Sequence, residues 1–269
     1  MYLASRSDPV QSSFAEAIGG GDVAAGWLID DEHGGASRGK VGLIEIGSGR
    51  TATLVSEKKY ERLLFVLAGH GAVRADNVSA DLRNGSVIFL PTGGAAEVQA
   101  RDDGLQLLLI QGSIAAERGP GKTASQGASP ANAEPLITHL EKVENVPFHR
   151  PELGFLHVAA RWLVDAKSAS ARSLVVGQST FVPGAAHLLH KHHHGDEFFY
   201  VFEGRGCHLI EGREIPMQPG DVVFAPREEW HGFRNTGDQP VRAIFGYFGV
   251  ASLEDAGYEV HEQGKRASG

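Results

Sequence analysis

A long internal repeat constrains this chain most strongly, because residues 41–91 align with residues 176–226 without a gap. The matching positions hold glycines, one proline and apolar side chains. Backbone sterics fix glycine and proline at turns. The apolar residues are fixed because their side chains must fill the interior of the domain. Two copies of one domain are therefore expected. The matching residues of the first copy are Val41, Gly42, Gly49, Leu54, Val66, Gly69, Gly71, Gly85, Val87, Phe89 and Pro91.

Short apolar runs that end at glycine or proline recur in both copies, such as GSVIFLP at residues 85–91 and GDVVFAP at residues 220–226. The chain holds 35 glycines and 12 prolines in 269 residues, and no long segment has a helical period. Runs of this kind are typical of half-buried antiparallel strands joined by tight turns. The sequence therefore predicts an all-β protein.

The charge of the chain narrows the choice of partners. A formal net charge of -8 provides no concentrated basic face, so no nucleic-acid partner is expected. No apolar run reaches the roughly 18 residues that span a bilayer, so no membrane partner is expected either. The single cysteine, Cys207, and the lack of a secretion signal in the first residues favour a cytoplasmic protein. A small molecule is the expected partner.

The two copies differ at four positions where the second carries histidine or glutamate and the first has lost that residue type. Because the repeat conserves architecture, a difference of this kind indicates function. The pairs are His190 facing Val55, His192 facing Glu57, Glu197 facing Arg62, and His231 facing Ala96.

The four polar residues of the second copy can converge if strands bring them together. His190 and His192 are two residues apart, so on a strand both side chains point to one face. Glu197 follows a short turn, and His231 belongs to a later strand. Three imidazoles and one carboxylate suit Fe, Mn, Zn, Ni or Cu and leave positions open for a substrate.

These residues also carry a family resemblance. The spacing Gly184-x5-His190-x-His192-x4-Glu197-x6-Gly204 resembles the first cupin motif. The second cupin motif is similar to Gly220-x5-Pro226-x-Glu228-x2-His231-x3-Asn235, except at one position. The resemblance implies two double-stranded β-helix barrels of the jelly-roll type in tandem. It also implies that His190, His192, Glu197 and His231 bind one divalent transition metal per chain, with Fe or Mn favoured.

The resemblance and the composition together divide the chain into five parts. A stretch rich in glycine, alanine, serine and proline separates the two copies and is predicted to be a linker. The first copy resembles a cupin barrel that has lost its ligands. The parts are an N-terminal segment at 1–37, the degenerate barrel at 38–112, the linker at 113–136, the metal-binding barrel at 137–252 and a C-terminal tail at 253–269.

One position departs from the motif, since Glu228 stands where the family has glycine and where the first copy keeps Gly93. Glu228 lies three residues before His231. It is the candidate for a catalytic acid or base beside the metal, and the alternative is a solvated loop carboxylate.

The remaining histidines of the cluster are expected to be bystanders. Strand alternation places His187 on the side of Lys191, away from His190, and it places His193 and His194 in a turn. In the first copy, an ion pair between Glu57 and Arg62 is the hypothesis for what replaces the metal.

Three functions are compatible with this pattern, because one metal cage supports several chemistries. The first is a dioxygenase-type oxidoreductase acting on a small organic molecule. The second is a non-redox Mn or Zn enzyme, a hydrolase, lyase or isomerase, similar to ureidoglycine aminohydrolases in its arrangement of barrels. The third is a protein that holds a metal and binds a small molecule without turnover. Cupin barrels commonly pair, so a homodimer is a further expectation of the resemblance.

Overall fold

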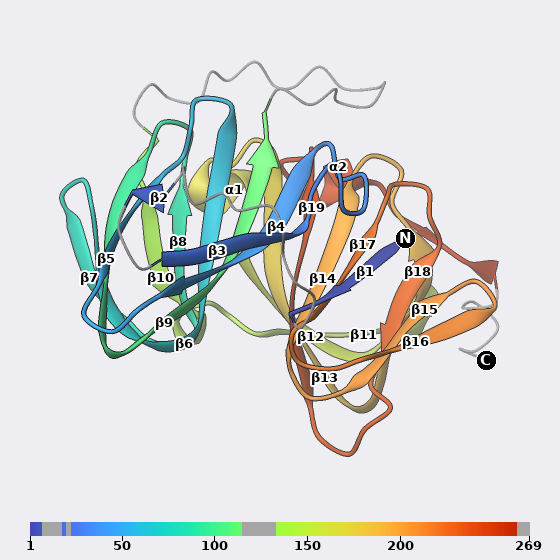
Figure 1. Ribbon diagram of the computed structural model, residues 1–269. Coiled ribbons are helices and arrows are strands. Elements are labelled where there is room, and N and C mark those ends of the chain that lie inside the picture. The colour runs from blue at the N-terminus through green and yellow to red at the C-terminus, as the bar shows by residue number, and fades with distance from the viewer. Residues whose placement is uncertain (7–17, 20–22, 115–132, 263–269) are drawn as a thin grey trace.

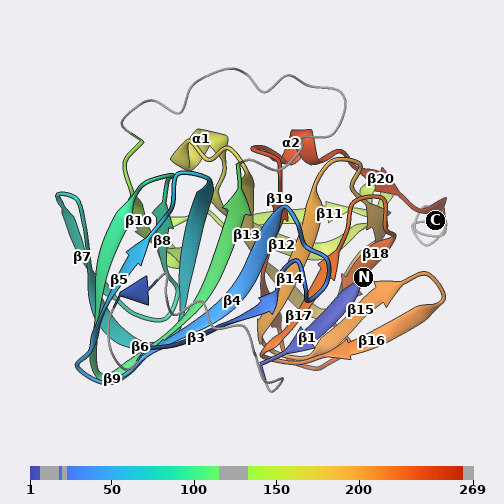
Figure 2. The same ribbon diagram turned by 45° about the horizontal axis from the view of Figure 1, so that its top comes forward.

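The structure, a computed structural model, describes residues 1–6, 18–19, 23–114 and 133–262. Within these residues the chain forms two antiparallel sheets, one of 11 strands and one of nine. Both sheets curl, and they lie side by side in two views (Figures 1 and 2). The prediction of an all-β protein with two barrels in tandem is confirmed. None of the helices in these ranges is long and apolar enough to cross a membrane.

The first barrel is built from the nine-stranded sheet, in which the order β10-β8-β6-β9-β4-β3 is continuous. Its longest strand, β9, pairs with β4, β5 and β6 and so closes the sheet around one interior. The strands are β2 (Ile18–Gly19), β3 (Val23–Ile29), β4 (Gly39–Ile46), β5 (Thr51–Val55), β6 (Tyr60–Ala75), β7 (Val78–Leu82), β8 (Ser86–Leu90), β9 (Ala95–Ser113) and β10 (Leu136–His139).

The second barrel is built from the 11-stranded sheet, in which the long β13 pairs with β12, β18, β19 and β20. Only short helical turns accompany the strands: η2 (Leu140–Lys142), η3 (Pro151–Leu153), α1 (Ala166–Ala169) and α2 (Leu253–Ala256). The strands are β1 (Tyr2–Ser5), β11 (Val146–Arg150), β12 (Phe155–Val164), β13 (Leu174–Lys191), β14 (Asp196–Glu203), β15 (Gly206–Ile210), β16 (Arg213–Met217), β17 (Asp221–Ala225), β18 (His231–Arg234), β19 (Val241–Phe248) and β20 (Glu259–Val260).

Each sheet takes a strand from beyond the segment that the repeat assigns to it. β1, near the start of the chain, pairs with β17 of the second barrel, and it lies among the orange strands in Figure 1. β10 comes after the linker, yet it pairs with β8 of the first barrel. β3 and β20 likewise extend the sheets into residues 1–37 and 253–269. At the 135-residue offset of the repeat, β1 corresponds to β10 within one residue and β3 corresponds to β12, so β1 and β10 are equivalent strands that the two barrels exchange.

The two barrels meet through a shared apolar core. Alternate residues of each strand point to opposite faces, so on β14 Phe198 and Tyr200 face the first barrel while Phe199 and Val201 face inward. Phe65 from β6 belongs to the same shared core. Because apolar side chains of both barrels are buried where the barrels meet, a fixed arrangement of the two barrels is favoured.

Buried polar contacts also join the barrels beside this core. The Glu61 carboxylate, 1% exposed, accepts hydrogen bonds from the backbone N–H groups of Arg172 and Ser173. Arg38 donates from Nη1 to the carbonyl of His194 at 2.6 Å and from Nη2 to that of Gly249 at 3.0 Å. The first barrel therefore holds the loop that follows the histidine-rich segment.

Candidate metal centre

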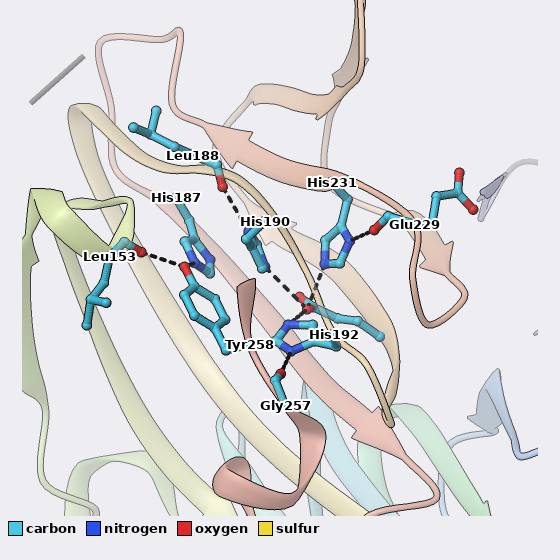
Figure 3. A network of polar contacts seen from close by, with 10 residues as sticks. Leu153, His187, Leu188, His190, His192, Glu229, His231, Gly257 and Tyr258 are labelled. Atoms are coloured by element: carbon cyan, nitrogen blue, oxygen red, sulfur yellow. Dashed lines mark hydrogen bonds and ion pairs between the residues drawn. The ribbon is translucent and has the colours of Figure 1, made fainter. Parts of the chain in front are cut away.

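The four residues proposed as metal ligands come together inside the second barrel. His190 lies on β13 and His192 directly follows it, while Glu197 lies on β14 and His231 on β18. One donor atom from each lies within 4.8 Å of the others, and all four side chains are buried. Figure 3 shows the three imidazoles turned toward one carboxylate.

The strand pairing explains why residues far apart in sequence converge here. His190 is the direct partner of His231 in the β13–β18 ladder, so their side chains leave the sheet on the same face. Glu197 points inward with Phe199, two residues along β14.

Each of the three imidazoles is oriented by a backbone carbonyl through its Nδ1 atom. A carbonyl only accepts hydrogen bonds, so Nδ1 carries a proton in each ring and Nε2 is the atom that can bind a metal. The Nε2 atoms of His190 and His192 are buried and have no hydrogen-bond partner in the protein. The bonds are His190 to Leu188 O at 2.8 Å, His192 to Gly257 O at 2.7 Å, and His231 to Glu229 O at 2.8 Å.

The Glu197 carboxylate faces all three Nε2 atoms. Its Oε2 lies 2.9 Å from His231, 3.0 Å from His192 and 3.8 Å from His190. The contact with His231 is within hydrogen-bond distance, whereas the unpaired Nε2 lone pairs of His190 and His192 would repel the carboxylate unless a positive charge lay among them. The donor set therefore fits a divalent transition metal.

The pKa values reflect the same concentration of charge. Burial, and then the charge of His231, lowers the pKa of His190 to about 4. For Glu197, burial raises the pKa, but the charge of His231 and the imidazole hydrogen bonds outweigh it and hold the pKa well below its usual value. For His231, burial lowers the pKa, yet Glu197 more than compensates and raises it. The carboxylate is thus held in its anionic form, as a metal ligand must be.

The expectation that His187 lies on the side of Lys191 is wrong. Its ring stacks on that of His190 with 3.7 Å between centroids, and on its other side it stacks on Phe155 at 4.0 Å. The register of β13 against β18 shifts between residues 187 and 190, and this irregularity breaks the simple alternation. His187 is not one of the four converging residues, but it supports the ring of one of them.

The C-terminal segment covers the group, a role that the sequence did not reveal. β20 pairs with β13 at the level of His190, and the Gly257 carbonyl orients His192. The Tyr258 hydroxyl accepts a hydrogen bond from His187 Nε2 at 2.9 Å and donates one to the Leu153 carbonyl (Figure 3). Burial raises the pKa of Tyr258, so the hydroxyl keeps its proton. These contacts join residues that are far apart in the sequence, so no local sequence pattern predicts them.

Glu228 is not brought into the group. Its side chain is 53% exposed, and its carboxylate contacts Lys191 at 3.1 Å and His193 at 2.9 Å. These hydrogen bonds, from His193 first and then Lys191, lower the pKa of Glu228. The motif has glycine at this position because the backbone is left-handed there, a conformation that favours glycine: φ is +67° at Glu228 and +78° at Gly93. The geometry favours the solvated carboxylate over the catalytic acid or base.

The first barrel fills the corresponding place in another way. Arg62, 4% exposed, donates from Nε to Gln111 Oε1 at 2.8 Å and from Nη1 to the Val55 carbonyl. Glu57 is exposed, and within the described ranges it makes no ion pair with Arg62. The hypothesis of a Glu57–Arg62 pair in place of the metal is wrong. Burial lowers the pKa of Arg62, and Glu57 raises it only through longer-range attraction.

Comparison with known proteins agrees with this geometry. A family model described as "Cupin domain" matches residues 177–247. The chain is 32% identical to dimethylsulfoniopropionate lyase DddW of Ruegeria pomeroyi over 128 residues, 46% of this chain and 80% of that protein. It is 29% identical to an oxalate-binding protein of Thermotoga maritima over 98 residues, 36% of this chain and 77% of that protein. Two other curated relatives are matched over only 58% and 55% of their own length.

Among solved structures, oxalate decarboxylase of Bacillus subtilis has a similar fold. The TM-score is 0.69 at 17% identity, and the match covers 98% of this chain and 80% of the other. An identity this low supports the fold alone, but it extends the likeness to both barrels. With the motif match and the similarity to DddW, the chain belongs to the cupin family.

Proposed function

We propose that the protein is a metal-dependent enzyme that acts on a small carboxylate held at His190, His192, Glu197 and His231. One observation carries this proposal: backbone carbonyls bind the Nδ1 atoms of three buried imidazoles and so direct their Nε2 atoms at one carboxylate. A metal bound there, with Fe or Mn favoured, would act as a Lewis acid or bind dioxygen beside the substrate.

The choice of a carboxylate rests on the relatives. Oxalate and dimethylsulfoniopropionate are both small carboxylates, and they are the compounds named for the two relatives described above. An anionic oxygen donor also suits a cationic centre that is enclosed by protein. The aromatic interior beside Glu197, which includes Phe199, Phe233 and Phe245, keeps water away from such a substrate.

Two reaction classes follow from the same site. A dioxygenase-type oxidoreductase is supported by the donor set, since three histidines and one glutamate suit redox-active Fe or Mn. A non-redox lyase is supported by the similarity to DddW, which covers 46% of the chain. The two classes differ in their need for O2.

Binding without turnover is the second candidate function, and the similarity to the oxalate-binding protein favours it. Enzymatic turnover is preferred because the four ligands of this group leave coordination positions open, whereas structural metal sites are closed by protein.

The test measures metal, binding, turnover and O2 in one preparation. The full chain is purified without oxygen, its metal is identified, and it is incubated with oxalate and with dimethylsulfoniopropionate. Loss of substrate with O2 uptake supports the oxidoreductase, and loss without O2 uptake supports the lyase. Metal-dependent binding without any loss supports the binding protein. If neither these two compounds nor a short hydroxy acid such as 3-hydroxypropionate binds in a metal-dependent manner, the proposal of a carboxylate site is wrong. Val55→Ala in the first barrel is the control and should change none of these results.

A further inference from the structure

A further histidine lies inside the second barrel, beside the four-residue group and outside it. His208 on β15 is 2% exposed, and its ring is parallel to that of His231, with 6.1 Å between centroids and 6° between planes. Its direct strand partner is Phe233, and Ile210, two residues along β15, pairs with His231. Residues in these positions share one face of the sheet, so His208 points into the same interior as the group.

The imidazole of His208 makes no hydrogen bond to any of the residues that the structure describes. Both Nδ1 and Nε2 are buried without a partner, whereas the Nδ1 atoms of His190, His192 and His231 are all bonded to carbonyls. Burial, and then the charge of His231, lowers the pKa of His208 to about 3, so the ring is neutral and offers one donor and one acceptor. A buried polar group left unpaired is destabilising, and in native proteins it calls for an explanation.

The surroundings supply no protein partner for the ring. Phe233 packs on Phe181 at 5.0 Å and on Phe199 at 4.7 Å between ring centroids, so the neighbouring interior is aromatic. A pocket that is largely apolar, with a few polar groups that converge, is the usual design of a small-molecule site.

The first barrel strengthens the argument. The repeat aligns His208 with Val73, which is 2% exposed in the interior of the first barrel. The strand pairing agrees, because His208 faces Ile215 and Val73 faces Ala80. The barrel that has lost its four ligands therefore also has an apolar residue at this fifth place. The fold does not need a histidine there.

We propose that His208 is a substrate-binding residue that hydrogen-bonds a neutral polar group of a small monocarboxylate whose carboxylate lies at the four-residue group. This inference rests on the proposed function and deepens it. A divalent ion and the Glu197 carboxylate leave one net positive charge, which a single carboxylate neutralises. A second carboxylate against His208 would be a buried charge without a counter-ion. The substrate class is thus a short carboxylic acid with a hydroxyl or carbonyl group.

The test compares two acids that differ by one hydroxyl, propionate and 3-hydroxypropionate, in titrations of the manganese-loaded full chain. The wild type should bind 3-hydroxypropionate about 5- to 10-fold more tightly than propionate. In His208→Val, which installs the residue of the first barrel, this ratio should fall to about 1, and His208→Gln should retain part of it. The control His149→Val removes an exposed histidine of the same barrel and should keep the full ratio.

Two further readouts separate a binding role from a structural one. The metal-free His208→Val protein should unfold at the same temperature as the wild type or higher, because the variant removes an unpaired buried group. Its metal content should also be unchanged. A clear fall in unfolding temperature, or a loss of metal, overturns the proposal and makes His208 a structural residue or a ligand.

The outcomes also separate this inference from the function on which it rests. Propionate that binds only with metal present, at a ratio unchanged in His208→Val, overturns the role of His208 and leaves the carboxylate site standing. Failure of both acids to bind the wild type overturns the carboxylate site itself. Succinate, in which a second carboxylate replaces the hydroxyl, should bind more weakly than 3-hydroxypropionate; equal or tighter binding overturns the preference for a neutral group.

Discussion

At the same place in the two barrels, the second holds Glu197 among three imidazoles and the first holds Arg62 beside Gln111. The backbone there is equivalent, since Glu197 pairs with Ala225 and Arg62 pairs with Leu90, its counterpart in the repeat. Both side chains are buried and charged. Arg62 donates its hydrogen bonds to an amide and a carbonyl oxygen, whereas the Glu197 carboxylate faces three imidazole Nε2 atoms that could share a metal with it.

This difference separates what the fold requires from what the site requires. The first barrel closes around an apolar interior with Val73 and Ala96 where the second has His208 and His231. The barrel therefore forms without any of the polar residues of the second interior. Those residues are retained in the second barrel despite the free energy that burying them costs, which is the expectation for a functional site.

The largest effect is expected when a metal ligand of the second barrel is removed, which makes its interior more like that of the first barrel. His231→Ala should lower the affinity for the metal by more than about 100-fold, because loss of a residue that only supports a ligand already costs 10- to 100-fold. Activity should be lost with the metal. Metal analysis of the dialysed protein measures the effect, and the comparison variant Ala96→Gly in the first barrel should keep the wild-type content. Retention of both metal and activity in His231→Ala would remove this residue from the site.

The wild type should accordingly bind one metal per chain. Two equivalents per chain would mean that the first barrel also holds an ion, and the contrast between the barrels would disappear.

The next effect tests how the first barrel satisfies its buried charge. Arg62→Met should lower the free energy of unfolding by about 3 kcal/mol, because Gln111 Oε1 and the Val55 carbonyl lose their donor. The metal content of the second barrel should not change. Urea denaturation provides the measurement, and Glu57→Gln, at an exposed position without an ion pair to Arg62, should change the free energy by less than about 0.5 kcal/mol. An equal loss in both variants would restore the ion-pair explanation.

The sequence predicted the barrels and the converging residues because both depend on local rules. Turn glycines and strand alternation predicted the barrels and the shared face of His190 and His192, and the resemblance to the cupin motifs added Glu197 and His231 to the converging group. Where the chain departs from local rules, the prediction failed. A register shift in β13 turned His187 toward His190.

Long-range pairing accounts for the rest of what was missed. β1 joins β17, and β10 joins β8; the two short strands correspond at the repeat offset, but no local pattern shows that each pairs with a strand of the other barrel. Tyr258 reaches His187 across 71 positions of the sequence. A single sequence offers no register between such distant segments, so neither the exchange of strands nor the cover over the site could be anticipated.

The pH dependence of the free energy of unfolding tests whether the buried His208 ring, which the first barrel replaces with Val73, stays neutral in the folded protein. The folded pKa of His208 is about 3, below the usual 6.5, so the folded protein keeps this ring neutral while the unfolded chain takes up a proton. Proton uptake by this side chain has no effect on stability above pH 6.5, and it favours the unfolded chain increasingly as the pH falls from 6.5 toward 3. Between pH 6.5 and 5 the metal-free wild type should therefore lose up to about 2 kcal/mol more than His208→Val. Parallel urea curves at several pH values test this, and identical slopes would contradict it.

The smallest expected effect concerns the cover over the second barrel. Tyr258→Phe removes the hydrogen bonds that the hydroxyl makes with His187 and Leu153, which should lower the free energy of unfolding by about 1 kcal/mol. Because His187 stacks on His190 without binding the metal itself, the metal affinity should fall by less than in His231→Ala. Tyr60→Phe in the first barrel is the matched control, since the described residues show no hydrogen bond to that hydroxyl. If Tyr258→Phe released the metal completely, the C-terminal segment would be part of the binding site and not only its cover.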